Sequence, residues 1–294
     1  MSIIEDLKLQ FKIGDVLTKL IFWNIAFFAI PSILFGILPL FKVNIDYLNY
    51  VSLSSNPHEL ILKPWSIFTY AFCHSSILHI LFNLIMLNFA GRLFLIFFNQ
   101  KQLLSLYFVS SLFAGIVFLL SYMFFPALAN VNTSLVGASA SVMAILFATV
   151  SYSPLMNIRL LLFGNVKLWH ITLVLIVIDL FQLPKENTGG HLAHIGGAFF
   201  GYIYIRLLKN GTDICNWFTL IIDAFFSIFG NKKSKPFKKV HRTYKAPAEK
   251  RAAKIVTKDK VQQQIDEILD KISQSGYDSL SSEEKEFLFK AGKQ

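Results

Sequence analysis

Serine, histidine and asparagine side chains occur inside apolar stretches of this sequence, where polar groups are costly to bury and are therefore candidates for function. Ser139 carries a hydroxyl that becomes a nucleophile when a base removes its proton, and His194 is the usual type of base. Attack on a carbonyl creates an oxyanion that needs hydrogen-bond donors, which His79 and Asn83 can supply. These residue types are those of a nucleophilic acyl-transfer site.

The spacing of these residues places them on defined helix faces. His79 and Asn83 are four residues apart and share one face of a helix. His194 shares a face with Gly197 and Gly201, and this pair of glycines allows a second helix to approach closely. Such an approach would bring His194 within reach of Ser139, whose backbone N–H at a helix start is a further oxyanion donor.

The composition says which kind of element must position these groups. Of 294 residues, 54% are hydrophobic and 16% are charged, whereas soluble domains usually carry about 25% charged residues. This excludes a disordered chain, a disulfide scaffold and an ordinary soluble enzyme. We therefore predict an all-α, polytopic membrane protein.

Uncharged stretches long enough to cross a bilayer predict six membrane spans. Residues 102–158 form an uncharged run of 57 residues, which suits two spans with a break near residues 126–137. The polar candidates fall in the second, fourth and sixth spans, which run in the same direction and hold them at a similar depth. The predicted spans are residues 20–41, 73–92, 103–124, 138–153, 166–183 and 190–208.

Lysine and arginine in the short loops predict that both termini are cytoplasmic. Residues 213–230 contain Asp213 and Asp223, so we favour an interfacial amphipathic helix there over a seventh span. The predicted organisation is a cytoplasmic N-terminal segment (1–16), a six-span membrane domain (17–210), the interfacial helix (211–230), a basic linker (231–260) and a cytoplasmic helical hairpin (261–294).

The basic linker carries most of the positive charge of the chain. Residues 231–260 hold 12 Lys and Arg residues but only two acidic residues. A basic segment beside a membrane span indicates topology and contact with anionic lipid, and we expect no nucleic-acid binding. We expect the terminal hairpin to bind a cytoplasmic partner or to regulate access to the site.

At the residues named above, the sequence resembles the rhomboid family of intramembrane serine proteases. Residues 74–83 (HSSILHILFN) look like the oxyanion segment of the family, and residues 137–139 (GAS) look like its nucleophile motif. Residues 193–197 (AHIGG) followed by Gly201 look like its base and tight-packing motif, and residues 65–70 (WSIFTY) resemble the end of its long first loop.

The resemblance implies roles for individual residues. Ser139 would be the nucleophile and His194 the general base and acid, as a dyad without a third acidic residue. His79, Asn83 and the Ser139 backbone N–H would form the oxyanion hole. The implied reaction is hydrolysis of peptide bonds in or near transmembrane segments of membrane proteins, in a bacterial plasma (inner) membrane, without a metal or cofactor.

Several residues leave alternatives open. Ala140 and Met143 depart from the family pattern, which motivates an alternative: a catalytically silent rhomboid-like protein that binds transmembrane helices. Asp179 is a tempting third member of a triad, but the resemblance favours a structural role for it. For His191 we expect a structural or solvated position, and His191 with His194 lacks a carboxylate in the same span that would complete a metal site.

Overall fold

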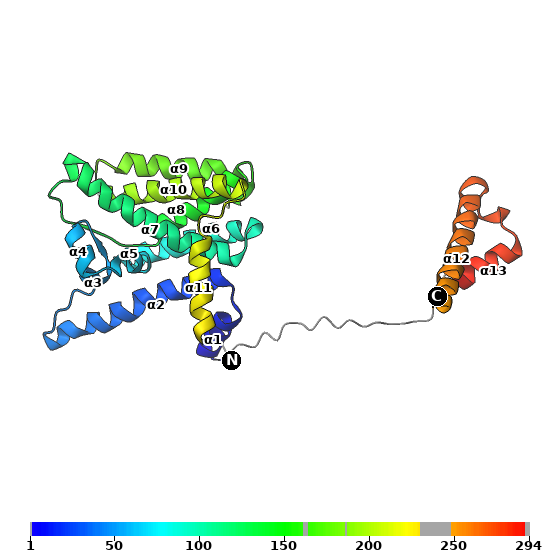
Figure 1. Cartoon of the computed structure of the whole chain (residues 1–294), viewed down its shortest axis with the longest axis horizontal. Helices are drawn as coiled ribbons and strands as arrows, with labels where there is room; N and C mark the ends of the chain where they lie inside the picture. Colours follow the sequence, from blue (N-terminus) through cyan, green and yellow to red (C-terminus); the bar gives the residue numbers. More distant parts are fainter. Residues whose placement is uncertain (1, 161–163, 186, 230–247, 292–294) are drawn as a thin grey trace. The chain divides into compact units, whose positions relative to one another are not determined.

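The computed structural model describes residues 2–160, 164–185, 187–229 and 248–291. The chain divides into two compact units, residues 1–231 and 232–294, which are described separately (Figure 1). Part of the predicted basic linker, residues 231–247, lies outside the described residues.

The first unit is mostly helical, and each predicted span coincides with a helix. Their bounds are Val16–Ile37 (α2), Ile77–Phe97 (α6), Gln100–Phe124 (α7), Ser139–Tyr152 (α8), Leu168–Gln182 (α9) and Thr188–Lys209 (α10), preceded by Ile3–Ile13 (α1). Among the described helices, α2 with its 3₁₀ extension Leu38–Phe41, α6 and α7 are long and apolar enough to cross a membrane, while α8 and α9 are apolar but shorter. The protein is thus an all-α membrane protein, and the count of six spans stays a prediction.

Polar caps define where the long helices begin. Asp15 accepts a hydrogen bond from the backbone of Thr18 (2.8 Å) at the start of α2. Ser76 accepts one from the backbone of His79 (3.2 Å) at the start of α6. Each cap satisfies a backbone N–H that has no partner within its own helix, so the apolar runs start as helices at these residues.

Helix α8 lies among α6, α7, α9 and α10, and most of its side chains are buried (Figure 1). It has only 14 residues, which is short for a bilayer crossing. Because protein surrounds the helix, its ends need not reach the lipid surface.

Helices α8 and α10 touch along the two glycines of α10. A Cβ atom built on Gly197 would lie 2.1 Å from the carbonyl oxygen of Ala140. A Cβ on Gly201 would lie 2.1 Å from the carbonyl oxygen of Ala144. Only glycine permits this approach of two backbones, so the predicted close packing at Gly197 and Gly201 is confirmed.

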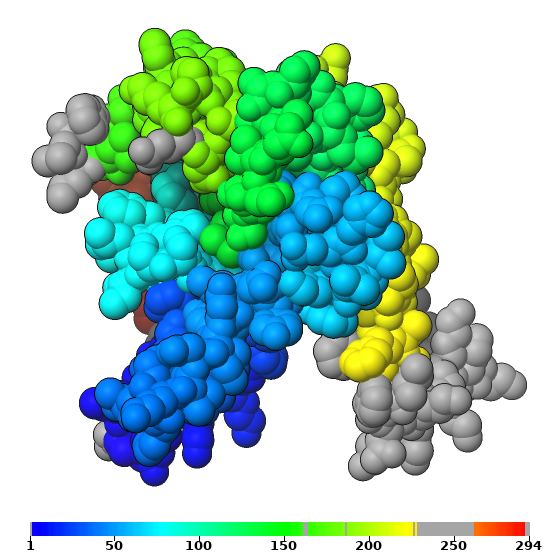
Figure 2. Space-filling view, turned by 90° about the vertical axis from the view of Figure 1, so that its left-hand side faces the viewer, coloured from blue at the N-terminus to red at the C-terminus, as the bar shows by residue number. Residues whose placement is uncertain are grey.

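The connections at the end of the bundle where α8 begins are structured. Between α2 and α6 the chain forms Leu48–Val51 (α3), Leu53–Ser54 (β1), Pro57–Leu62 (α4), Ser66–Thr69 (α5) and a 3₁₀ turn, Tyr70–Phe72. Strand β1 pairs with Ser134–Leu135 (β2) in antiparallel register, Leu53 opposite Leu135. Figure 2 shows this contact, with the light-blue segment before α6 beside the green segment after α7.

The strands are a feature that the sequence analysis did not predict. A second antiparallel pair, Asn157–Leu160 (β3) and Gly164–Lys167 (β4), connects α8 to α9. Strands β1 and β2 have two residues each, too few for an alternating pattern, and β3 and β4 have four each, the shortest length at which alternation indicates a strand.

Charged residues pair at the opposite end of the bundle. Arg92, near the end of α6, lies 3.4 Å from Asp15, before α2. Lys101, at the start of α7, lies 2.6 Å from Asp223 on Asn216–Phe229 (α11), the helix predicted to be interfacial. Phe218 of α11 also stacks on Phe108 of α7, with ring centroids 5.0 Å apart, so α11 packs on α7.

The second unit is a helical hairpin of Ala248–Ser275 (α12), a 3₁₀ turn at Tyr277–Ser279, and Ser282–Ala291 (α13). Helix α12 begins earlier than the predicted hairpin, so residues 248–260 of the predicted basic linker are helical. These residues were assigned to the linker by their charge, but Ala, Lys and Glu are also strong helix formers.

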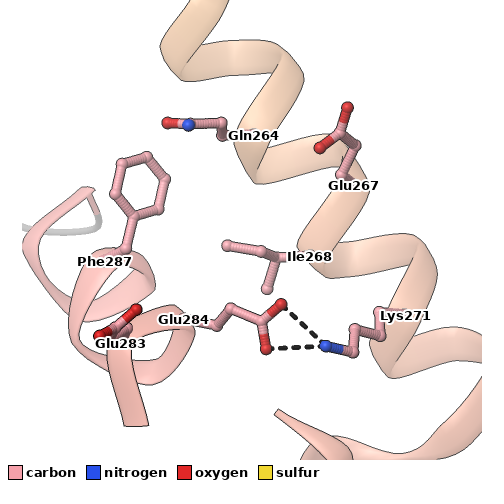
Figure 3. A pocket seen from close by; sticks show the side chains of 7 residues that line it. All are labelled: Gln264, Glu267, Ile268, Lys271, Glu283, Glu284 and Phe287. Carbon is pink, nitrogen blue, oxygen red and sulfur yellow. Dashed lines mark hydrogen bonds and ion pairs between the residues drawn. The ribbon is translucent and has the colours of Figure 1, made fainter. Parts of the chain in front are cut away.

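Polar and apolar contacts join the two helices of the hairpin (Figure 3). Ile268 and Phe287 face each other across a shallow pocket, beside an ion pair between Lys271 and Glu284 (2.8 Å). The hydrogen bond from Lys271 holds the pKa of Glu284 below its ordinary value. Glu284 also accepts from the backbone of Ser281 (2.7 Å), whose hydroxyl accepts from Glu284 N–H, so the two residues form a capping box at the start of α13.

Candidate active site

Ser139 and His194 form a hydrogen-bonded pair between two helices. Ser139 is the first residue of α8, and His194 lies in the second turn of α10. The Oγ of Ser139 lies 2.7 Å from Nε2 of His194. The two residues are 55 positions apart in the chain, and the Gly197 and Gly201 contacts on the same face of α10 bring their helices together.

Asp179 of α9 contacts the other ring nitrogen of His194. Its Oδ1 lies 2.9 Å from Nδ1 of His194 and 2.7 Å from Nδ1 of His191. The predicted arrangement was a dyad with Asp179 in a structural role, whereas the structure places this carboxylate directly on the imidazole. A signal for it was present in the sequence, since an ionisable residue in a span is a functional candidate by default.

The same three residues, Asp179, His191 and His194, also meet the minimum requirement for a metal site, because their ligand atoms all lie within 4.8 Å of one another. The carboxylate that the sequence analysis found missing from the histidine helix comes from α9. However, the two Nδ1–Oδ1 separations of 2.7 and 2.9 Å are shorter than the roughly 3.3 Å expected between two ligand atoms around tetrahedral zinc. The distances are those of hydrogen bonds.

Asn83 lies beside Ser139 and offers an amide group to the site. It is 6% exposed and lines the same two cavities as Ser139. Its Nδ2 donates to the backbone carbonyl of His79 (2.9 Å), which orients the amide. Since an amide nitrogen carries two N–H bonds, one N–H stays available to a ligand.

His79 stands next to the turn that leads into α8. Its Nδ1 lies 3.1 Å from Oγ of Ser75, and its Nε2 lies 2.9 Å from where a Cβ of Gly137 would be. Gly137 has φ +117°, which L side chains rarely adopt, and its N–H bonds to the carbonyl of Tyr70 (2.9 Å). Glycine is therefore required here both for its conformation and for the space that His79 occupies.

The turn at Gly137 leaves backbone donors free at the start of α8. The first intrahelical bond of α8 runs from Val142 N–H to the carbonyl of Ala138, so the N–H groups just before Val142 have no partner within the helix. The positive end of the helix dipole lies at the same point. The Ser139 N–H is thus suited to receive a developing negative charge.

Two neighbouring positions have other surroundings. Ser141 donates to the backbone carbonyl of Tyr107 on α7 (2.8 Å), on a different face of α8 from the site. Met143 is buried and lines a cavity together with His194. Ala140 is also buried, and its backbone contacts Gly197.

Two cavities of different character meet at Ser139, Asn83 and His194. One, of about 250 Å³, is lined mainly by apolar side chains of α6, α8 and α9, including Phe82, Met86, Val142, Leu175 and Ile178. The other, of about 450 Å³, is more polar and lies toward the loops, where Leu48, Ser75, His79, Ser134 and Asn187 line it. Figure 2 views this loop end of the first unit.

The fold and the site together define a helical membrane protein with a serine–histidine pair in its interior. The family model of the Rhomboid domain matches residues 62–211, and the chain belongs to the rhomboid family. That family generally includes intramembrane serine proteases. A second model, described as a family of unknown function, matches residues 256–292. No curated protein matches this chain significantly.

Proposed function

We propose that this protein is an intramembrane serine endopeptidase that hydrolyses peptide bonds in or near transmembrane segments of other membrane proteins. The observation that carries the proposal is the 2.7 Å contact between Ser139 Oγ and His194 Nε2 inside the membrane unit. A serine hydroxyl held against an imidazole is the arrangement by which a weak nucleophile is activated.

The proposed reaction begins when His194 Nε2 takes the proton of Ser139 Oγ as this oxygen attacks the scissile carbonyl carbon. The carbonyl oxygen becomes an oxyanion, which accepts hydrogen bonds from the Ser139 backbone N–H, Asn83 and His79. His194 then gives its proton to the leaving amine, and an acyl-enzyme is left on Ser139. Water, deprotonated by His194, attacks this ester and releases the new carboxylate.

The two cavities support this reaction. The apolar cavity suits a side chain of a substrate that approaches from lipid, since Phe82 and Ile178 at its edge are 63% and 46% exposed. The polar cavity on the loop side suits the water that hydrolysis consumes. The substrates are accordingly transmembrane proteins, and the chemistry needs no metal or organic cofactor.

We further propose that α2, α6, α7, α8, α9 and α10 all cross the membrane, with both termini in the cytoplasm of a bacterial cell. Arg92 and Lys101, each paired with an aspartate, lie at the end of the bundle that holds the start of α2. At the same end Lys209 donates to the carbonyl of Ser151 (3.2 Å). Positive charge at one end is typical of the cytoplasmic side. In this orientation the basic segment after residue 230 meets anionic lipid, and the hairpin meets a cytoplasmic partner.

The test compares the purified wild type with Ser139→Ala on a model transmembrane substrate and with a serine-directed fluorophosphonate. We expect cleavage and labelling by the wild type only, because loss of a serine nucleophile costs orders of magnitude in rate. Equal cleavage by both proteins would refute the proposal. A wild type that binds transmembrane helices but neither cleaves nor labels would be the catalytically silent rhomboid-like protein.

A further inference from the structure

Asp179 occupies the position from which a carboxylate can control a catalytic imidazole. Its side chain is 8% exposed, so water competes little for its oxygens. The Oδ1 atom accepts from Nδ1 of His194 at 2.9 Å, while Nε2 of the same ring lies 2.7 Å from Ser139 Oγ. The three residues come from three helices, α9, α10 and α8, and form one continuous hydrogen-bonded chain.

The direction of this chain determines the tautomer of His194. An ionised carboxylate only accepts hydrogen bonds, so Nδ1 of His194 must carry the proton that lies between the two residues. A neutral imidazole has one N–H, which leaves the lone pair on Nε2, facing Ser139 Oγ. This is the tautomer that a base needs in order to remove the serine proton.

His191 holds the same carboxylate oxygen from the preceding turn of α10. Its Nδ1 lies 2.7 Å from Oδ1 of Asp179, and its ring stands at 88° to that of His194, with centroids 5.7 Å apart. By the same argument His191 is a donor at Nδ1. Two donors on one oxygen restrict rotation of the carboxylate and keep it aligned with His194.

We propose that Asp179 is a positioning residue for His194 and that His191 supports it. The site would then be a serine–histidine–aspartate triad and not a dyad. The proposal rests on the proposed proteolytic function. Asp179 orients the ring and fixes its tautomer in the ground state. When the Ser139 proton reaches Nε2, the adjacent carboxylate offsets the charge of the imidazolium.

The experiment measures kcat and KM on a transmembrane substrate, the rate of fluorophosphonate labelling, and thermal unfolding, all with the full-length chain. For Asp179→Asn we expect kcat and the labelling rate to fall by about 10²-fold or more, because an amide carries no charge and can present N–H to Nδ1. We expect KM to stay within about twofold, the pattern of a lost transition-state interaction.

A matched control removes a carboxylate elsewhere in the same unit. Asp15→Asn takes away the partner of Arg92, while asparagine still caps a helix well. We expect its kcat and labelling rate to equal those of the wild type. Asp179→Glu, which keeps the charge, should recover part of the rate lost in Asp179→Asn.

Substitution of His191 provides a second test. For His191→Ala we expect a smaller fall in kcat, up to about tenfold, and the double variant with Asp179→Asn should be no slower than Asp179→Asn alone, since both act through one carboxylate. Additive losses would contradict the support role of His191.

The outcomes separate this proposal from the proposed function. If the wild type cleaves and labels, and folded Asp179→Asn does both at the same rate, the role of Asp179 is refuted and proteolysis stands. A raised KM with unchanged kcat in Asp179→Asn would also refute this role. So would a fall in activity that only matches the amount of folded protein lost, because Asp179 would then be a structural contact between α9 and α10. If the wild type neither cleaves nor labels, proteolysis is refuted as well.

Discussion

At the scale of single residues, the site depends on polar atoms held in place by their own helix. Asn83 is an example, because its amide donates to His79 one turn earlier, while its Oδ1 has no hydrogen-bond partner among the described residues. The residue therefore presents an oriented amide beside Ser139 at the cost of an unpaired acceptor.

Replacing Asn83 by alanine should lower turnover by about 10²–10³-fold, because one oxyanion donor is lost. KM should change little, since the oxyanion exists only after attack. The measurement is steady-state cleavage of a transmembrane substrate. Asn24→Ala is the matched control, because Asn24 is also buried in a span and bonds to Tyr107 (3.3 Å), away from the site. It should lose stability but retain kcat, and an unchanged turnover in Asn83→Ala would remove Asn83 from the oxyanion role.

At the scale of elements, the contact of α8 with α10 sets the distance between nucleophile and base. Gly197 and Gly201 lie on the face of α10 that carries His194. At each glycine a backbone carbonyl of α8 occupies the space that a side chain would otherwise fill. The helix axes are thus as close as two backbones allow, and the side chains of Ser139 and His194 can meet.

Gly201→Ala should separate the two helices, because its Cβ would meet the carbonyl oxygen of Ala144 at 2.1 Å. Overpacking of this kind costs about 1–3 kcal/mol, so we expect a lower unfolding temperature and a lower kcat. Gly36→Ala is the control, since Gly36 lies in α2 with no atom within 4 Å of an added Cβ. It should be neutral or stabilising by about 0.5–1 kcal/mol. If Gly201→Ala unfolds and cleaves like the wild type, the close approach is not needed.

At the scale of the whole molecule, two ion pairs between helices lie at one end of the membrane unit. Asp15 pairs with Arg92, and Asp223 with Lys101, at the end where α2 and α7 begin. Polar groups of the site, among them Ser139 and Asn187, lie at the start of α8 and α10, toward the opposite end. The site accordingly opens away from the side that is cytoplasmic in the proposed orientation.

A reporter fused after residue 294 should behave as cytoplasmic, because the twelve Lys and Arg residues of 231–260 resist transfer across the membrane. The measurement is a pair of fusions, one active only in the cytoplasm and one only outside. A fusion in the loop between α9 and α10 should give the opposite signal. An external signal from the C-terminal fusion would mean an odd number of spans and would make α11 a seventh.

The sequence by itself predicted the membrane class, a helix at each of the six proposed spans and, through the resemblance to a known family, the pairing of Ser139 with His194. These follow from local properties: an uncharged run can only be satisfied as a helix in lipid, and a polar residue there is unusual enough to be noticed. The packing role of Gly197 and Gly201 could also be predicted from local sequence, because two glycines on the face of the helix that carries His194 indicate close packing of a second helix.

The tertiary structure alone decided what touches the second nitrogen of His194, and how β1 meets β2. Asp179 was visible as a charged residue in a span, but its contact depends on the rotation of α9 about its axis and on its distance from α10. Residue spacing within one helix does not encode these quantities, because they result from packing among all the helices at once. For that reason the carboxylate on the imidazole could be recognised only when the three helices were placed together.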